Sequence, residues 1–446
     1  MRLTLLTLLM GTGLALFAQQ PKIMTLQECV DLAVQNNLNV QRSKLNLETA
    51  EVNKMQADFQ RYPSLNASGG PGFSWGRSID PTSNQFITQE IFSVNMNANS
   101  GVTLYNAGRI NNSIKQNERT VAASEYDVTK STNDVQLNVV TFYLNVIFNK
   151  ELLDNARFQL ESSRNQLERT KKLVAAGSLP RTNELELESQ VSTNEVNLIT
   201  AENNLNLAKL SLKQAMLIPA SDDIDVIAPE VEIEQPDLAT STDDLFATAE
   251  NTMPEIKAAD FRVMSSEFAY RSALSQKYPT LSLNAGVSTN YSSAARRFDP
   301  SFDGSSWVFT EQLQNNFRQF VSMSLSIPIF NGHQATANVQ RSKINIQQSE
   351  INAQEQRNNL RQTIESAFND VQAASKSYAA AEKQVSSLEE TFRSVENQFN
   401  NGAANATDLQ VAQNNLYRAK SDLTRAKFDF IFKKKLLDFY QGKSIF

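Results

Sequence analysis

Apolar and small side chains recur at every seventh position through residues 332–401, which is the strongest pattern in the chain. The row begins at Val339 and ends at Val395, and a second apolar row, four residues behind the first, continues to Phe399. No Pro or Gly falls between these positions. Two such rows are typical of a long helix that packs along other helices. At 1.5 Å per residue, a helix over 332–401 is about 105 Å long, far longer than a compact domain needs.

Residues 107–176 carry the same rhythm and are predicted to form a second long helix. The seventh-position row runs to Phe142 and resumes at Leu153, so that the step between them is four residues longer than one heptad. Such a stutter locally relaxes the supercoil of packed helices. The two long helices are therefore expected to be counterparts.

Shorter helices are predicted over 25–61, 182–217, 243–278 and 405–440. The first begins with Thr25 and Glu28, which have the spacing of a capping box. Asn36-Asn37 is expected to loosen that helix near its middle.

Alternation of apolar and polar side chains predicts four strands, over 64–75, 91–104, 280–291 and 320–330. In the second of them, Phe92, Val94 and Met96 alternate with Ser and Asn. Each strand is long enough to cross a bilayer when tilted. One apolar face and one polar face suit a strand that lies between lipid and water.

The order of these elements occurs twice, so the chain is predicted to consist of two structural repeats. Tyr62-Pro63 matches Tyr278-Pro279 before the strand pairs, Tyr105-Asn106 matches Phe330-Asn331 after them, and Gly177 matches Gly402 in the turns between helices. The second and third matches are both 225 residues apart. The predicted organisation is a signal peptide over 1–18, a first repeat over 19–217, an equatorial linker over 218–242, a second repeat over 243–440 and a tail over 441–446.

The linker is acidic, and two short strands are expected in it, over Asp225–Ala228 and Val231–Glu234. Two of the shorter helices placed end to end match the length of one long helix. Each repeat is therefore expected to supply two helical columns, with the linker as a belt around their middle.

Four strands cannot close a barrel, and open sheet edges do not occur in lipid. A homo-oligomer that shares one barrel above a helical tube is therefore predicted. The alternative is a soluble coiled-coil protein with incidental hairpins.

Composition narrows the class of protein further. Met1–Ala18 reads as a secretory signal, with Arg2 ahead of an apolar stretch. Beyond it no run of about 20 apolar residues exists, so no transmembrane helix is expected. The net charge of −6 argues against nucleic-acid binding. One Cys and one His exclude an intrachain disulfide and argue against a metal site. No nucleophile–base pair or phosphate-binding glycine loop is present, so neither an enzyme nor a cofactor is predicted.

Taken together, the paired Tyr-Pro entries to the strands, the Tyr/Phe-Asn exits and the glycine turns make the mature chain resemble the TolC-like outer-membrane efflux proteins. The resemblance implies a mainly α fold with membrane strands, in which long antiparallel coiled-coil helices form a trimeric α-barrel tunnel in the periplasm. It implies a 12-strand β-barrel in outer-membrane lipid, with four strands from each chain. The implied partners are a periplasmic adaptor (membrane-fusion) protein and an inner-membrane pump. The implied docking residues are those of the tip turns: Gly177, Ser178, Leu179, Gly402, Ala403 and Ala404.

The same resemblance places a pore constriction beside the second glycine turn. Asp408 matches an aspartate that faces the lumen in the family, and three copies would form a negative ring that favours cations. An equally good interpretation is that Thr407 and Asp408 only begin a helix. The first-repeat equivalent is Asn183, and Ala404 stands where a gate-locking Arg is expected. A closed tip is therefore expected to rest on apolar contacts near Phe399, Leu179 and Leu409.

The predicted function is a passive exit duct for small molecules in a tripartite efflux system. A duct for protein secretion or metal export is the nearest alternative, because the channel itself does not choose the cargo. A structural or adhesive coiled-coil surface protein is the alternative from another class.

Overall fold

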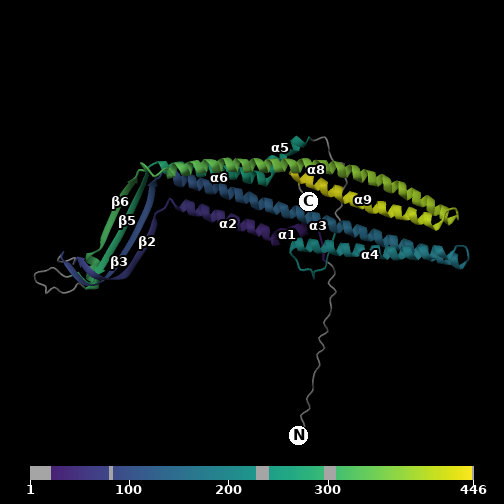
Figure 1. Ribbon diagram of the computed structural model, residues 1–446, viewed down its shortest axis with the longest axis horizontal. Coiled ribbons are helices and arrows are strands. Elements are labelled where there is room, and N and C mark those ends of the chain that lie inside the picture. The colour runs from purple at the N-terminus through teal and green to yellow at the C-terminus, as the bar shows by residue number, and fades with distance from the viewer. Residues whose placement is uncertain (1–21, 80–83, 228–240, 296–307, 444–446) are drawn as a thin grey trace, which may run out of the picture. The chain divides into compact units, whose positions relative to one another are not determined.

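The computed structural model describes residues 22–79, 84–227, 241–295 and 308–443 (Figure 1). The predicted signal peptide and the expected strand Val231–Glu234 lie outside these ranges. The chain divides into two compact units. The helical unit comprises Met1–Ser43, Val128–Met253 and Arg357–Phe446, and the sheet unit comprises Lys44–Asp127 and Pro254–Gln356.

Two helices of 67 residues each run from one unit into the other. They are α3 (Arg109–Ala175) and α8 (Gln334–Asn400), within the ranges where the heptad rows predict them. In the helical unit, the seventh-position residues Leu360, Ala367 and Ala374 of α8 are buried. The return helices are α4 (Arg181–Met216) and α9 (Ala406–Tyr440). The seventh-position row of α8 is therefore buried against neighbouring helices, as the pattern predicts.

The helix expected over 25–61 is two helices, α1 (Leu26–Asn36) and α2 (Leu38–Phe59). Asn37 between them is extended, with φ −65° and ψ 124°. Its side-chain oxygen accepts a hydrogen bond from the amide of Asn39 at 2.8 Å. The Asn side chain thus caps the second helix, and competition of this kind between side chain and backbone explains the break. The capping box of Thr25 and Glu28 is present as predicted.

The helix expected over 243–278 is also divided, which the sequence analysis did not anticipate. It consists of α5 (Thr242–Thr252), α6 (Pro254–Leu274) and a 3₁₀ turn at Ser275–Lys277. Met253 is extended because the proline that follows it disfavours helical backbone at that residue. Pro254 can begin the next helix, since its missing amide hydrogen has no partner to lose there.

The core of the helical unit surrounds Tyr143 of α3. Cys29 and Val30 of α1 and Leu212 of α4 belong to the same buried cluster. β1 (Lys22–Met24) pairs in parallel with β4 (Ile224–Val226), and the Tyr143 hydroxyl donates a hydrogen bond to the carbonyl of Ile227 at 2.6 Å. One strand of the predicted linker thus exists, one residue earlier than expected, while its partner β1 was not predicted.

A charge cluster holds β4 from its outer side. Asp225 accepts a hydrogen bond from Lys150 at 2.7 Å, and the ammonium of Lys209 lies 3.4 Å away. Burial acts to raise the pKa of the Asp225 carboxyl, but the hydrogen bond from Lys150 and the charge of Lys209 outweigh it and lower the pKa. The carboxylate therefore stays ionised and ties the linker to α3 and α4.

The sheet unit holds one antiparallel sheet in the order β2-β3-β5-β6. The strands are β2 (Ser64–Ile79), β3 (Phe86–Tyr105), β5 (Thr280–Ser292) and β6 (Arg318–Ser326), with α7 (Phe309–Asn315) before the last. The first two strands are longer than predicted. The expectation of a strand over 320–330 was wrong at its end: Pro328 has no amide hydrogen for a ladder, and β6 stops at Ser326.

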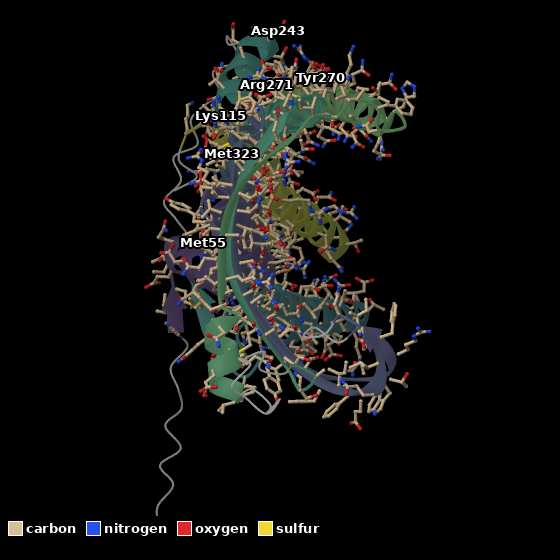
Figure 2. The ribbon with its side chains drawn as sticks, turned by 90° about the vertical axis from the view of Figure 1, so that its left-hand side faces the viewer. Met55, Lys115, Asp243, Tyr270, Arg271 and Met323 are labelled. Carbon is tan, nitrogen blue, oxygen red and sulfur yellow. The ribbon has the colours of Figure 1, made fainter. Side chains whose placement is uncertain are left out.

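The register gives the sheet two chemically different faces. Figure 2 shows the side chains along the curved strands, with Met323 of the apolar face labelled. The apolar face includes Leu65, Ala67, Pro71, Phe73, Phe92, Val94, Met96, Ala98, Leu281, Leu283, Ala285, Val287, Tyr291, Val321, Met323 and Leu325, with polar side chains at Arg77, Glu90, Ser100, Thr289 and Gln319. The polar face includes Ser64, Asn66, Ser68, Ser93, Asn95, Asn97, Asn99, Ser282, Asn284, Ser288, Asn290, Ser292, Ser322, Ser324 and Ser326, together with Arg318, Phe320, Ile87 and Ile91.

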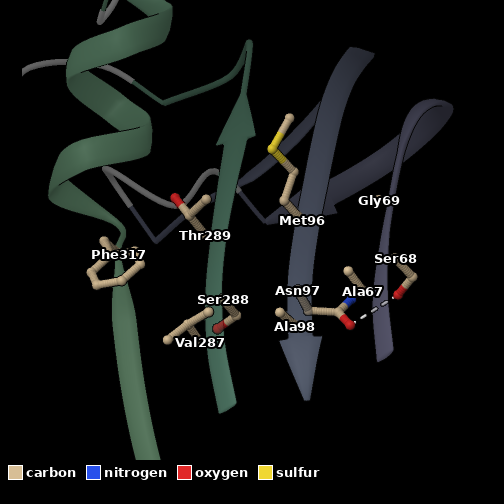
Figure 3. A pocket seen from close by; sticks show the side chains of 10 residues that line it. All are labelled: Ala67, Ser68, Gly69, Met96, Asn97, Ala98, Val287, Ser288, Thr289 and Phe317. Carbon is tan, nitrogen blue, oxygen red and sulfur yellow. Dashed lines mark hydrogen bonds between the residues drawn. The ribbon is translucent and has the colours of Figure 1, made fainter. Parts of the chain in front are cut away.

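The large side chains of the apolar face are exposed. Leu65 and Val321 keep 76% and 75% of their accessible surface. A hollow of about 390 Å³ on this face is lined by Met96, Val287 and Phe317 among others, and Figure 3 shows the lining side chains. Monomeric soluble proteins rarely expose an apolar surface of this extent, so this face is built for contact with another apolar phase or partner. Among the described helices, none combines the length and the apolar character that a membrane span requires.

Candidate functional site

The two glycine turns of the helical unit have the same backbone geometry. In the first, the amide of Gly177 donates to the carbonyl of Val174 at 2.9 Å and the amide of Ser178 donates to Leu173 at 2.9 Å. These paired bonds are the Schellman motif, which needs a residue with left-handed backbone, and Gly177 has φ +75°.

The second turn repeats this geometry 225 positions later. The amide of Gly402 donates to Phe399 at 3.0 Å and the amide of Ala403 donates to Gln398 at 2.8 Å, with φ +71° at Gly402. The two repeats therefore share the same individual hydrogen bonds in their glycine turns. Each turn closes one end of a helical hairpin, α3–α4 or α8–α9 (Figure 1).

The helices that follow the turns begin differently. Asn405 caps α9: its side chain accepts from the amide of Asp408 at 2.7 Å, and the Asp408 carboxylate accepts from the amide of Asn405 at 3.4 Å. At the equivalent position of α4, Pro180 makes no side-chain cap, and Asn183 donates its backbone amide to the Pro180 carbonyl at 3.1 Å. Asp408 therefore helps to cap α9, as the third residue of that helix in a capping box with Asn405. Asn405 is the cap residue, and Thr407 and Asp408 lie in the first turn of α9.

Two of the predicted constriction residues meet in one cavity of about 260 Å³. Phe399, near the end of α8, and Leu409, in the first turn of α9, line it together with Phe158 and Arg169 of α3. Leu409 is buried, whereas Phe399 is half-buried. Asp408 and Asn183 do not line this cavity. Phe399 and Leu409 thus line one cavity, and their apolar contact stays a prediction, while Leu179 is half-buried in the first turn.

A network of uncharged side chains, which the sequence pattern did not predict, joins the helices next to this cavity. Gln410 of α9 donates to the side-chain oxygen of Gln190 of α4, and Gln190 donates to Asn194 at 3.1 Å. Gln413 of α9 donates to the hydroxyl of Ser162 of α3 at 3.0 Å. The only signal for these residues in the sequence is that they are polar at positions facing other helices.

Ion pairs hold each hairpin along its length. Arg164 and Lys171 of α3 contact Glu195 and Glu188 of α4 at 2.7 and 3.4 Å. Lys420 of α9 contacts Glu389 of α8 at 2.8 Å. Because these pairs are exposed, each adds about 1 kcal/mol or less. In the part of the chain that the structure describes, no group of three or more Cys, His, Asp or Glu is arranged to hold a metal ion.

Solved structures define the class of fold. The chain matches VceC, the outer membrane protein of Vibrio cholerae, with a TM-score of 0.75 at 16% identity, over 94% of this chain and 97% of that one. It matches the CmeC outer membrane channel of Campylobacter jejuni with a TM-score of 0.73 at 16% identity, over 94% of this chain and 85% of that one. The fold is therefore that of the outer-membrane channels.

The model of the outer membrane efflux protein family matches residues 29–216 and 245–430. The chain belongs to this family, and the two matched segments lie within the two predicted repeats.

Two named relatives match the chain in sequence over part of its length. The chain is 28% identical to the outer membrane protein TolC of Escherichia coli K12 over 227 residues, 50% of this chain and 44% of TolC. It is 22% identical to the cation efflux system protein CusC of E. coli O157:H7 over 326 residues, 70% of this chain and 63% of CusC. The chain thus spans less than two thirds of the length of each of these relatives.

Proposed function

We propose that this chain is the outer-membrane duct of a tripartite efflux system, through which small molecules leave passively. The observation that carries the proposal is the two-faced sheet: its apolar face suits lipid and its polar face suits an aqueous lumen. The chain runs from this sheet directly into the long helices, from β3 into α3 and from β6 into α8. A duct built from these elements can carry solutes past the helices and through the sheet region without a chemical step. We therefore assign the chain no enzymatic activity.

Three copies are needed to complete the duct. β2 and β6 each have one neighbour in the described sheet, and lipid does not tolerate open edges. Three four-stranded sheets close a barrel of twelve strands.

The helices also present a surface for a second copy. α2 exposes an apolar side chain at every seventh position: Leu38, Leu45, Val52 and Phe59 are 63%, 60%, 56% and 62% exposed. A row with this spacing is the seam of a coiled coil that lacks its partner. We therefore infer a homotrimer in which the next protomer covers this row.

The turns at the ends of the hairpins are the proposed contact with the periplasmic adaptor, which links the duct to an inner-membrane pump. Gly177, Ser178, Gly402 and Ala403 are exposed, so their backbone is free to meet another protein. Beside them, Asp408, Asn183, Phe399 and Leu409 remain the proposed constriction. The capping role of Asp408 is compatible with a lumenal carboxylate, because the side chain is exposed.

Purified protein in nonionic detergent tests the proposal. A trimer that inserts into planar bilayers and passes ions supports the duct, whereas a soluble rod without conductance supports the structural or adhesive coiled coil. The conductance test does not identify the cargo, which we propose to be small molecules. If a deletion strain accumulates a secreted protein or a metal, and no small molecule, the result would instead support a duct for protein secretion or metal export.

A further inference from the structure

Arg318 is the one charged side chain on the polar face of the four described strands, and this sets it apart. The register places Arg318, Ser288, Asn97 and Ser68 in a single row across β6, β5, β3 and β2. Every other described position of that face in these strands is uncharged. Arg318 is exposed and makes no ion pair with a described acidic residue.

The neighbouring row holds an aromatic ring beside this cation. Phe320 lies two residues further along the same face of β6, opposite Gly286 of β5. A Cβ atom at Gly286 would stand 2.6 Å from the ring of Phe320 and 2.6 Å from the side-chain oxygen of Asn99. The ring therefore occupies the space above this glycine, so its position is fixed by the backbone beneath it. Phe320 still keeps 45% of its surface exposed.

The rest of the two rows supplies hydrogen-bonding groups without charge. The side-chain oxygen of Asn97 accepts from Ser68 at 2.9 Å and from Asn99 at 3.0 Å, so the Asn97 amide group keeps its two hydrogens directed away from these bonds. The bond between Ser68 and Asn97 is drawn in Figure 3. No carboxylate on this face of the described strands competes for the guanidinium.

From this arrangement we propose that Arg318 and Phe320 form a binding site for small aromatic anions on the polar face of the sheet. The guanidinium supplies charge and a planar set of donors, the ring supplies a flat apolar surface, and Ser288 and Asn97 supply neutral polar contacts. The inference rests on the proposed function, since in the trimer three such sites line one lumen. Aromatic anions that leave through the duct would bind there transiently, whereas cations would not bind.

Binding of pyranine, a pyrene trisulfonate, to the purified trimer in nonionic detergent tests the site by fluorescence anisotropy. Arg318→Gln is expected to weaken binding by about tenfold or more, as loss of a charge-assisted contact does. Arg77→Gln is the matched control. Arg77 belongs to the same sheet, but its register places it on the opposite face, where its guanidinium lies 4.5 Å from the ring centre of Phe86. The control makes the same change in charge and should leave binding within about twofold.

Phe320→Leu separates the two parts of the site. It should weaken pyranine binding but leave unchanged the affinity for inorganic sulfate, measured by competition. The site is rejected if wild type shows no saturable binding, if Arg318→Gln binds like wild type, or if Arg77→Gln loses as much as Arg318→Gln. Because the measurement needs no conductance, a trimer that binds pyranine but passes no ions would reject the duct and keep the site.

Discussion

The side-chain amide of Gln410 donates a hydrogen bond to the side-chain oxygen of Gln190, and this bond joins the two return helices α9 and α4. Both partners are uncharged, so the link does not depend on salt or on pH near neutrality. Together with the bond from Gln413 to Ser162, it ties α9 to both helices of the first hairpin. The helices beside the cavity that Phe399 and Leu409 line are therefore held together by side-chain amides at this point.

Removal of this link should loosen the proposed constriction. Gln410→Ala leaves the Gln190 oxygen without its donor and should cost about 1 kcal/mol of the contact between α4 and α9. The expected result is a higher single-channel conductance or open probability in planar bilayers. Gln398→Ala is the control, because the side-chain amide of Gln398 donates to Ser394 in its own helix and to no other described residue. Equal behaviour of the two variants would show that the Gln410 bond does not restrain the tip.

The lumenal position of Asp408 can be tested with a thiol. Asp408→Cys should be blocked by a charged thiol reagent added to the open channel, with a fall in conductance, if three copies line the constriction. The chain's own Cys29 is buried, and burial raises its pKa to about 12, so it should not react in the folded protein. Wild-type channels are thus the control and should stay unmodified. An unchanged conductance after confirmed labelling of residue 408 would leave Asp408 with its capping role alone.

Substitution of either turn glycine by alanine should destabilise the protein, because of the backbone conformation at these positions and not because of a steric clash. At Gly177 and Gly402 a Cβ atom would meet nothing within 4 Å, but φ is +75° and +71°. Alanine in this left-handed region costs about 1–2 kcal/mol. We expect Gly402→Ala and Gly177→Ala to lower the unfolding free energy by similar amounts in denaturant titrations. Ala403→Gly, next to the second turn, is the control and should have the smaller effect. A loss confined to one turn would contradict the equivalence of the repeats.

Stability should fall at alkaline pH through Cys29 and Tyr143. Burial raises the pKa of the Cys29 thiol from 9.0 to about 12 and that of the Tyr143 hydroxyl from 10.0 to about 12. Both pKa values are higher in the folded chain than in the unfolded chain. The stabilisation is therefore full below the unfolded values and is lost as the pH rises toward about 12.

Cys29→Ala identifies the first of these two groups. Because the unfolded thiol is half ionised at pH 9.0 and the unfolded tyrosine only at pH 10.0, the unfolding free energy of the variant should decline less steeply over that interval than that of wild type. Urea titrations across the interval measure the difference. The same slope in both proteins would mean that Cys29 ionises as freely in the folded chain as in the unfolded one.

The hydrophobic pattern predicted the long helices because each seventh residue of α3 and α8 must face a neighbouring helix, and burial of Leu360 and Ala374 follows from that geometry. The strands were predicted from alternation, but their ends were not. β6 stops at Ser326 because of Pro328, a signal that was present in the sequence. Pro254 was likewise a readable signal for the break after α5. The strand β1 was not predictable, since three residues carry no period and its pairing with β4 depends on segments some 200 residues apart.

The candidate site shows the same limits. Gly177 and Gly402 were predicted because a turn with positive φ selects glycine. Phe399 and Leu409 were placed near each other because both lie beside one turn, and both line the same cavity. The partners Gln190, Phe158 and Arg169 come from other helices, and only the packing of α3, α4 and α9 brings them to the cavity or its network. Sequence spacing within one helix cannot supply such contacts.

Single-channel recording of the purified protein in a planar bilayer tests the central claim most directly. The duct predicts that trimers, identified by mass in detergent, insert and give discrete steps of ion current whose size changes with Gln410→Ala or with reagent bound at Asp408→Cys. Folded protein that stays monomeric, or trimers that insert and never pass current in wild type or in either variant, would contradict it.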